Sequence, residues 1–208
     1  MKLKKKPKRI LITIIVIAAV VAIGFVGYNI FFGQPEVTEA KVLKTIDKYG
    51  YTLKDNKTKR YQDMFRELDE ILSKDPVDEE EYVRKITEMI IYDFYSLDDK
   101  TAKTDVGGTD FIYSESLPNF LDNAEDTYYK YVESDIYNQR NQKLPVVDEI
   151  TIESVEQTEF AYGETSDDSA YEVQVAWTYT DSDFDNYQSE ATLTFVHEDI
   201  KLALAELK

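Results

Sequence analysis

The segment from 171 to 179 alternates strictly between two kinds of side chain. Its aromatic and β-branched positions are Tyr171, Val173, Val175, Trp177 and Tyr179. Its smaller or polar positions are Glu172, Gln174, Ala176 and Thr178. Because successive side chains of an extended strand point to opposite faces, this pattern predicts a β-strand with one buried face. Few other sequence patterns restrict the conformation of a segment so narrowly.

The same period of two recurs on both sides of this segment. Ile150 and Ile152 alternate before it, Ala191 to His197 alternate after it, and Ile200 to Leu204 form a last alternating run. Turn-rich segments connect these runs at 163–169, 181–186 and 197–199. Consecutive strands joined by short loops predict an antiparallel meander of about four strands.

Before residue 146 the apolar residues instead recur at helical spacing. Thr58 is a suitable N-cap for a first helix, which ends before Pro76. Asp78 and Glu81 form a capping-box pattern at the start of a second helix. A third helical pattern follows Ser116 and includes Phe120, Ala124, Tyr128, Tyr131 and Val132. The predicted class is therefore α+β, with two or three helices packed on a four-stranded antiparallel meander.

An uncharged apolar stretch runs from Ile10 to Phe32, directly after a basic cluster that contains Lys2 and Arg9. As a helix it would rise about 35 Å, which is enough to cross the hydrocarbon core of a bilayer. Basic flanks stay on the cytoplasmic side, so we expect the rest of the chain outside the cell membrane. The alternative is a signal peptide cleaved near Val20-Val21-Ala22, which would leave an apolar new terminus at Ile23 to Phe32.

These features divide the chain into four parts. Residues 1–9 are a cytoplasmic basic tail, and residues 10–32 are a transmembrane helix. Residues 33–57 are a stalk or linker that ends in a short strand or turn at 49–56. Residues 58–208 are an extracytoplasmic α+β domain, because about 150 residues suffice for one hydrophobic core.

The predicted outer part of the chain is strongly acidic. All 41 Asp and Glu follow residue 32, together with 18 of the 24 Lys and Arg, which gives a net charge of −23 there against −17 for the whole chain. Such a charge disfavours nucleic-acid binding. The absence of Cys excludes disulfides and thiolate metal sites, and suits a Gram-positive type of cell envelope.

Three groups of residues are candidate sites. His197 is the only histidine, but no nucleophile motif accompanies it, so a structural role is preferred. Asp181, Asp183 and Asp185 match the start of a calcium loop, but Asn186 and Thr192 stand where Gly and Glu are needed, so a solvated turn is preferred. Gly107-Gly108 resembles an anion-binding nest, but a turn with positive φ explains the pair better.

The remaining chemistry is unspecific. Carboxylates are so frequent that no pair suitable for glycoside hydrolysis stands out. The tyrosine clusters at 92–95 and 128–131 suit core packing, with a peptide or glycan groove as the alternative. We therefore predict no catalytic, cofactor-binding or metal-binding residue.

Helices followed by a curved four-stranded meander, with Trp177 in a central strand, resemble the cystatin-like and nuclear-transport-factor-like fold. That resemblance implies helices on the concave face of the sheet and a pocket between them. The basic tail, single span and outer domain resemble bitopic scaffold subunits of Gram-positive conjugative type IV secretion systems. The segments DFYSLDDKTAKTDVGG, from Asp93, and DTYYKYV, ending at Val132, resemble a family of Firmicutes membrane proteins. No functional residue carries over.

The anchor and a folded domain without a catalytic motif favour a non-enzymatic function. We expect an extracytoplasmic domain that binds a protein partner or acts as a scaffold in the bacterial cell envelope. The alternative is a small-ligand-binding or hydrolytic domain with a pocket between sheet and helices. A weaker alternative is calcium-dependent binding at Asp181 to Asp185.

Overall fold

The computed structural model describes residues 40–208 except 138, 163 and 164. The predicted basic tail, the transmembrane helix from Ile10 to Phe32 and the start of the stalk lie outside these residues. Among the residues described, no helix combines the length and apolar character needed to cross a bilayer.

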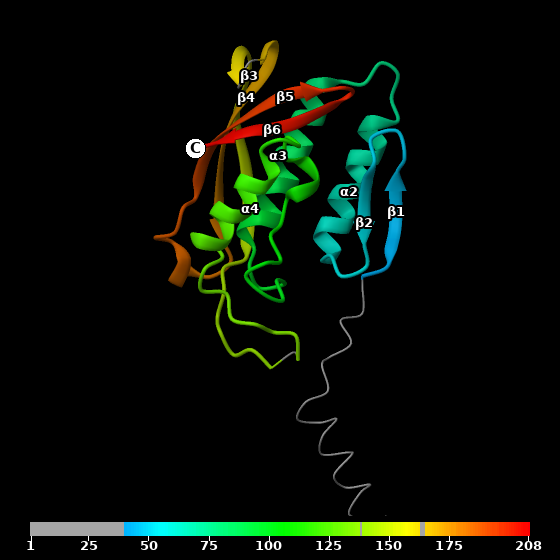
Figure 1. Cartoon of the computed structure of the whole chain (residues 1–208). Helices are drawn as coiled ribbons and strands as arrows, with labels where there is room; N and C mark the ends of the chain where they lie inside the picture. Colours follow the sequence, from blue (N-terminus) through cyan, green and yellow to red (C-terminus); the bar gives the residue numbers. More distant parts are fainter. Residues whose placement is uncertain (1–39, 138, 163–164) are drawn as a thin grey trace, which may run out of the picture. The chain divides into compact units, whose positions relative to one another are not determined.

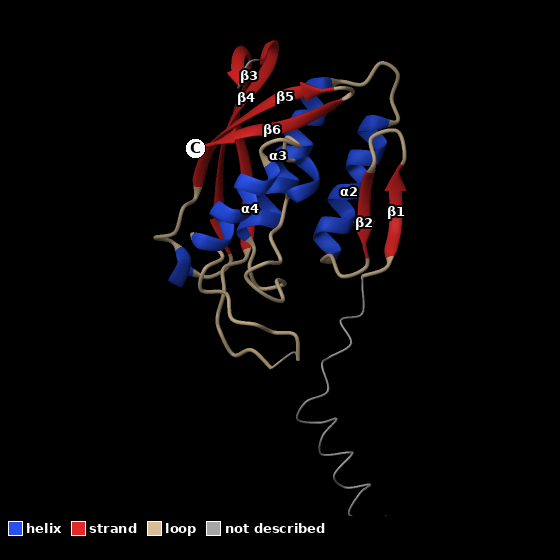
Figure 2. Ribbon diagram, viewed as in Figure 1, coloured by secondary structure: helices blue, strands red, loops and turns tan. Residues whose placement is uncertain are grey.

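The predicted α+β class is confirmed, with three α-helices and a four-stranded antiparallel sheet (Figures 1 and 2). The strands are β3 (Val147–Tyr162), β4 (Thr165–Tyr179), β5 (Glu190–Glu198) and β6 (Lys201–Leu207). Their order in the sheet is β3-β4-β5-β6, which is the predicted meander. The strict alternation of β4 holds, since Tyr171, Val173, Val175, Trp177 and Tyr179 are all buried.

Strands β3 and β4 are longer than the alternation in their sequences indicates. β4 begins at Thr165, within the segment 163–169 that was predicted to be a loop. Three irregularities in the register of β3 and β4 shift the pairing along the ladder. Because each shift interrupts the period of two, the pattern alone does not reveal how far the hairpin extends.

The helices are α2 (Lys59–Leu72), α3 (Glu79–Tyr95) and α4 (Leu117–Asp126). The caps of the first two are as predicted: the Thr58 hydroxyl accepts the N–H of Tyr61, and the Asp78 carboxylate accepts those of Glu80 and Glu81. α3 is buried along most of its length because it lies between α2 and the strands β3 and β4.

The third helix ends earlier than predicted. The pattern extended to Val132, but α4 stops at Asp126, and Thr127 is its C-cap. The chain then turns so that the hydroxyl of fully buried Tyr129 donates to the carbonyl of Phe94, at 2.7 Å. A continued helix would remove this buried hydrogen bond, so a tertiary contact overrides the helical spacing.

The segment predicted as the end of a stalk belongs to the folded domain. It forms a hairpin of β1 (Val42–Ile46) and β2 (Tyr51–Lys54), with Gly50 at a φ of 67° in the turn. Tyr51 is 1% exposed, its ring centroid lies 4.9 Å from that of Phe111, and its hydroxyl shares a 2.5 Å hydrogen bond with the hydroxyl of Tyr82. The predicted domain start at residue 58 is therefore too late.

Candidate functional site

A groove with a volume of about 420 Å³ lies between α4 and β6. We call it the α4–β6 groove. One wall is the end of β6, from Leu204 to Leu207, and the other is a face of α4. The last residues of α3, Phe94 and Tyr95, also line it, together with Tyr128. The groove thus lies between the sheet and two helices.

Helix α4 presents one continuous face to this groove. The lining residues from α4 and its two ends recur at three- and four-residue intervals: Ser116, Asn119, Phe120, Asn123, Ala124 and Thr127. This spacing places them on one side of the helix. Only Ala124 is buried, so α4 contacts the core over a narrow stripe. The Asn119 and Asn123 side chains make no hydrogen bond to another described residue, which leaves both amides available to a bound molecule.

The aromatic side chains along the groove are held firmly. The ring of Phe94 lies 5.2 Å from that of Phe120, and Tyr95 lies 5.0 Å from Tyr128 and 4.3 Å from Trp177. These contacts between rings of different elements restrict the rotamers of the lining. Most rings of the tyrosine clusters pack in the core, as preferred from the sequence, and Phe94, Tyr95 and Tyr128 also line the groove.

The open edge of β6 forms the second wall. Thr192 and Lys208 exchange two backbone hydrogen bonds of 3.0 Å, and Leu207 pairs with Leu193 one position further along. In an antiparallel ladder, a hydrogen-bonded pair is followed by a non-hydrogen-bonded pair. The N–H and C=O of Leu207 therefore point away from β5, toward the open edge.

The other half of the same edge is already occupied. The N–H of Leu202 donates to the Tyr82 hydroxyl at 3.3 Å, and the carbonyl of Leu204 accepts the N–H of Tyr113 at 2.9 Å. Within the described residues, Leu207 has no such partner. The unpaired part of β6 is thus the part that lines the groove.

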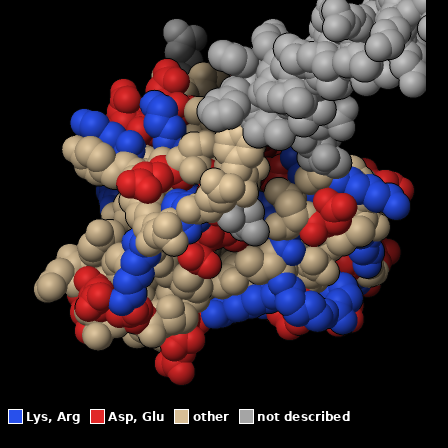
Figure 3. Space-filling view, turned by 90° about the horizontal axis from the view of Figure 1, so that it is seen from below, with Lys and Arg blue, Asp and Glu red and all other residues tan. Residues whose placement is uncertain are grey.

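Charge is sparse within the groove. Glu206 is the one charged residue in its lining, and its carboxylate lies 2.6 Å from Nζ of Lys208. The outer side of α4 carries Asp122, Glu125 and Asp126 and no basic residue. Elsewhere acidic and basic side chains are interspersed, as the face in Figure 3 shows.

A second polar site lies sealed in the core, next to the groove in sequence. The Asp93 carboxylate accepts Nζ of Lys57 at 2.7 and 2.8 Å, Nζ of Lys100 at 2.9 Å and the N–H of Gly108 at 2.8 Å. Lys100 also donates to Asp99 at 2.8 Å. The side chains of Lys100 and Asp93 are only 2% and 4% exposed. We call this group the Asp93–Lys100 centre.

The opposite charges of this centre keep each other ionised. Burial alone would raise the pKa of Asp93, but Lys100 and Lys57 outweigh it and bring the pKa down to about 2. Burial also opposes the charge of Lys100, yet Asp93 and Asp99 raise its pKa above the ordinary value. Both groups are therefore ionised at neutral pH. Since each carboxylate oxygen already accepts two hydrogen bonds, the centre suits a structural role better than catalysis.

Gly107 and Gly108 complete the centre. Gly108 adopts a φ of 74°, which confirms the predicted turn with positive φ. At Gly107 the restriction is space, because a Cβ there would lie 2.0 Å from the carbonyl oxygen of Asp93. Its N–H donates to the Tyr129 hydroxyl at 3.0 Å. The glycine pair does approach an anion, and that anion is the protein's own Asp93.

His197 contacts two carboxylates. Its Nδ1 lies 2.8 Å from Asp167, which also accepts the backbone N–H of His197 at 2.7 Å. Its Nε2 lies 3.6 Å from the Glu79 carboxylate, and Glu79 accepts the hydroxyl of Tyr171 at 3.0 Å. The group near Nε2 is thus a carboxylate rather than the hydroxyl or thiol of a Ser-His or Cys-His pair. The arrangement ties the start of α3 to the sheet, in line with the structural role preferred from the sequence.

The aspartates of the possible calcium loop bind a lysine instead. Asp181 and Asp183 both form ion pairs with Lys143, at 2.6 Å for Asp183. Asp181 also accepts the N–H of Asp183 and caps a short 3₁₀ turn. Across the described ranges, no cluster of three or more His, Asp or Glu has a geometry that could hold a metal ion.

Sequence reasoning missed both the Asp93–Lys100 centre and the open half of β6. The first has a signal: Asp93 is the one charged residue in the apolar run IIYDFY of α3, and a charge on a buried helix needs a partner. The groove has no comparable signal, because the polar residues of α4 have the spacing of a solvated helix face.

No protein-family model, no curated protein and no solved structure matches the chain. The candidate site therefore rests on its geometry alone.

Proposed function

We propose that this protein is a membrane-anchored, extracytoplasmic binding domain of a bacterial cell envelope, which holds a protein partner in the α4–β6 groove. The observation that carries the proposal is the groove itself, with its aromatic lining, two available side-chain amides and an unpaired strand edge. Recognition sites in proteins commonly combine apolar surface with a few such polar groups. A scaffold role in a secretion or other envelope assembly would use the same surface.

The composition of the groove favours binding over hydrolysis. Among the described residues that line it, Glu206 is the one carboxylate, and no histidine or lysine lies in the lining. General acid–base catalysis most often uses His, Glu or Asp, and the one such residue in the lining is already paired with Lys208. The proposed function is accordingly non-enzymatic and needs no cofactor.

The proposed location depends on the apolar stretch from Ile10 to Phe32 and its basic flank. Because the chain has no Cys, single cysteines can report on topology. A cysteine at exposed Lys130 should react with a membrane-impermeant maleimide in intact cells, whereas a cysteine at Lys6 should react only after lysis. Labelling of Lys6→Cys in intact cells, or protection of Lys130→Cys, would contradict this orientation.

The likeness to cystatin-like and nuclear-transport-factor-like proteins stays a proposal. It is supported by the order of elements and by the groove between α4 and the sheet. A small ligand is the second candidate occupant, because a volume of about 420 Å³ falls within the range of small-molecule pockets. Native mass spectrometry of the purified chain would show a retained small molecule as a discrete mass increment.

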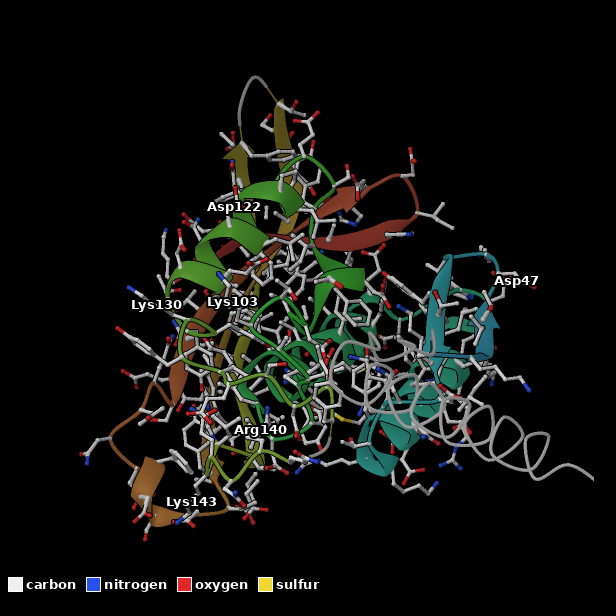
Figure 4. All side chains as sticks on the ribbon, turned by 60° about the horizontal axis from the view of Figure 1, so that its bottom comes forward. Asp47, Lys103, Asp122, Lys130, Arg140 and Lys143 are labelled. Carbon is white, nitrogen blue, oxygen red and sulfur yellow. The ribbon has the colours of Figure 1, made fainter. Side chains whose placement is uncertain are left out.

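Photo-crosslinking in cells tests the proposed site. Asn123 and Asp122 are neighbours on α4, both exposed, but only Asn123 lines the groove (Figure 4 labels Asp122). Benzoylphenylalanine at 123 should give a discrete adduct with a partner protein, and the same group at 122 should not. Equal adducts at both positions, or none at 123, would contradict a partner in the groove.

A further inference from the structure

The unpaired half of β6 indicates how a partner is held. Resting on the proposed function, we propose that the α4–β6 groove takes an extended, basic segment of the partner protein, which pairs with β6 as a fifth strand. The two ends of this edge differ: Leu202 and Leu204 already have partners from within the chain, whereas Leu207 has none among the described residues. Strand addition requires such a vacant donor and acceptor on a sheet edge.

The register of the ladder identifies the atoms that pair. Leu207 is flanked by Glu206 and Lys208, and Lys208 directs its N–H and C=O toward Thr192 of β5. The backbone groups of Leu207 therefore face the groove, and an added chain can bond to them without disturbing the pairing of β5 and β6. The irregularity between Thr194 and Phe195 bulges β6 near Ala205, which limits the pairing to the end of the strand.

The opposite wall fits an extended chain as well. A strand leaves backbone groups on its second side, and the amides of Asn119 and Asn123 can donate to and accept from such groups. Alternate side chains of the added strand would face the aromatic lining at Phe94 and Phe120, which favours apolar residues at those positions.

The acidic charge around the groove favours a basic partner segment. The lining holds Glu206 and no Lys or Arg, and the exposed side of α4 adds Asp122, Glu125 and Asp126. Lys208 is paired with Glu206 and Lys103 with Glu125, which leaves Asp122 and Asp126 of α4 without an ion pair among the described residues. The sequence after residue 32 carries a net charge of −23, so a second copy of this chain would be repelled. The complementary occupant has Lys or Arg at the positions that face away from the lining.

The test uses full-length protein in nanodiscs of neutral phosphatidylcholine and a phage-displayed library of random decapeptides. Enriched decapeptides should alternate apolar and basic residues. Their binding should be at least about tenfold weaker for Leu207→Pro than for Leu207→Ala, because both changes shorten the side chain but only proline removes the outward N–H. Enrichment of acidic peptides, enrichment of none, or equal binding by both variants would overturn the proposal.

Hydrogen exchange covers the case in which Leu207→Pro unfolds. In the wild-type chain, a bound decapeptide should slow exchange of the Leu207 amide, and Asn119→Trp, which fills the groove from the opposite wall, should abolish both binding and protection. Unchanged exchange at Leu207 with the peptide bound would overturn strand addition. If the adduct from position 123 persists in cells with Leu207→Pro, the groove remains the partner site and only the fifth strand is excluded.

Discussion

Three consecutive residues at the end of α3 lie in two opposite environments. Asp93 lies in the buried Asp93–Lys100 centre, where both of its carboxylate oxygens have partners and its side chain is 4% exposed. Phe94 and Tyr95 line the α4–β6 groove, where side-chain amides and a strand edge have no partner among the described residues. The Asp93–Lys100 centre is the closed side of this helix end and holds it in place. The α4–β6 groove is its open side and offers a surface for recognition. Substitutions should therefore affect stability on one side and binding on the other.

The largest effect is expected for Lys100→Met. Removal of the ammonium group leaves Asp93 and Asp99 short of a partner for a buried charge, and the free energy of unfolding should fall by about 3–5 kcal/mol. Urea unfolding followed by the fluorescence of Trp177, the only tryptophan, measures it. Lys103→Met is the matched control, because Lys103 is half exposed and lies 3.6 Å from Glu125. Equal effects of the two changes would show that the centre is not closed.

Gly107→Ala should have the next largest effect. The new Cβ would lie 2.0 Å from the carbonyl oxygen and 2.4 Å from the carbonyl carbon of Asp93, so backbone must move. A loss of about 3 kcal/mol is expected from such overpacking. Gly50→Ala has a φ of 67° but a nearest contact of 3.7 Å, so it should cost only about 1 kcal/mol of αL strain. The reverse ranking in urea unfolding would contradict the tight packing at Gly107.

The dependence of stability on pH gives a smaller and more specific effect. Burial raises the pKa of Asp167, but the N–H groups of His197 and Ser169 and the His197 side chain lower it to about 2. A lowered native pKa stabilises the fold above the unfolded value near 4, and this contribution disappears as the pH falls toward 2. Asp167→Asn should therefore cost about 1 kcal/mol at pH 7, with a smaller difference from wild type at pH 2.5. A difference independent of pH would exclude an ionic role for Asp167.

The sequence predicts those parts of the fold that local chemistry determines. The caps at Thr58 and Asp78 and the alternation in β4 follow from nearest neighbours, and all three appear in the structure. Of the β1–β2 hairpin, only a short strand or turn at 49–56 was predicted, because strands of five and four residues are too short to establish a period. Tertiary contacts, such as that of Tyr129 with Phe94, cannot be read from spacing.

The Asp93–Lys100 centre and the α4–β6 groove are hidden in the sequence for different reasons. Lys100 lies in the polar segment LDDKTAK and has the composition of a solvated loop, although its side chain is 2% exposed. The groove depends on the separation of α4 from β6, and this separation is a property of the packed core. The polar residues of α4 look alike in the sequence whether they face solvent or a binding groove.

The smallest effect on stability is expected on the open side. The variant combines Asn119→Ala with Asn123→Ala. Both asparagine side chains are exposed and make no hydrogen bond to described residues, and alanine has a higher helix propensity than asparagine. The free energy of unfolding should change by no more than about 0.5 kcal/mol, while the crosslinked adduct from Thr127, on the same face of α4, should weaken. A loss of stability near that of Lys100→Met would mean that the amides belong to the core, and the contrast between the two ends of Asp93-Phe94-Tyr95 would no longer hold.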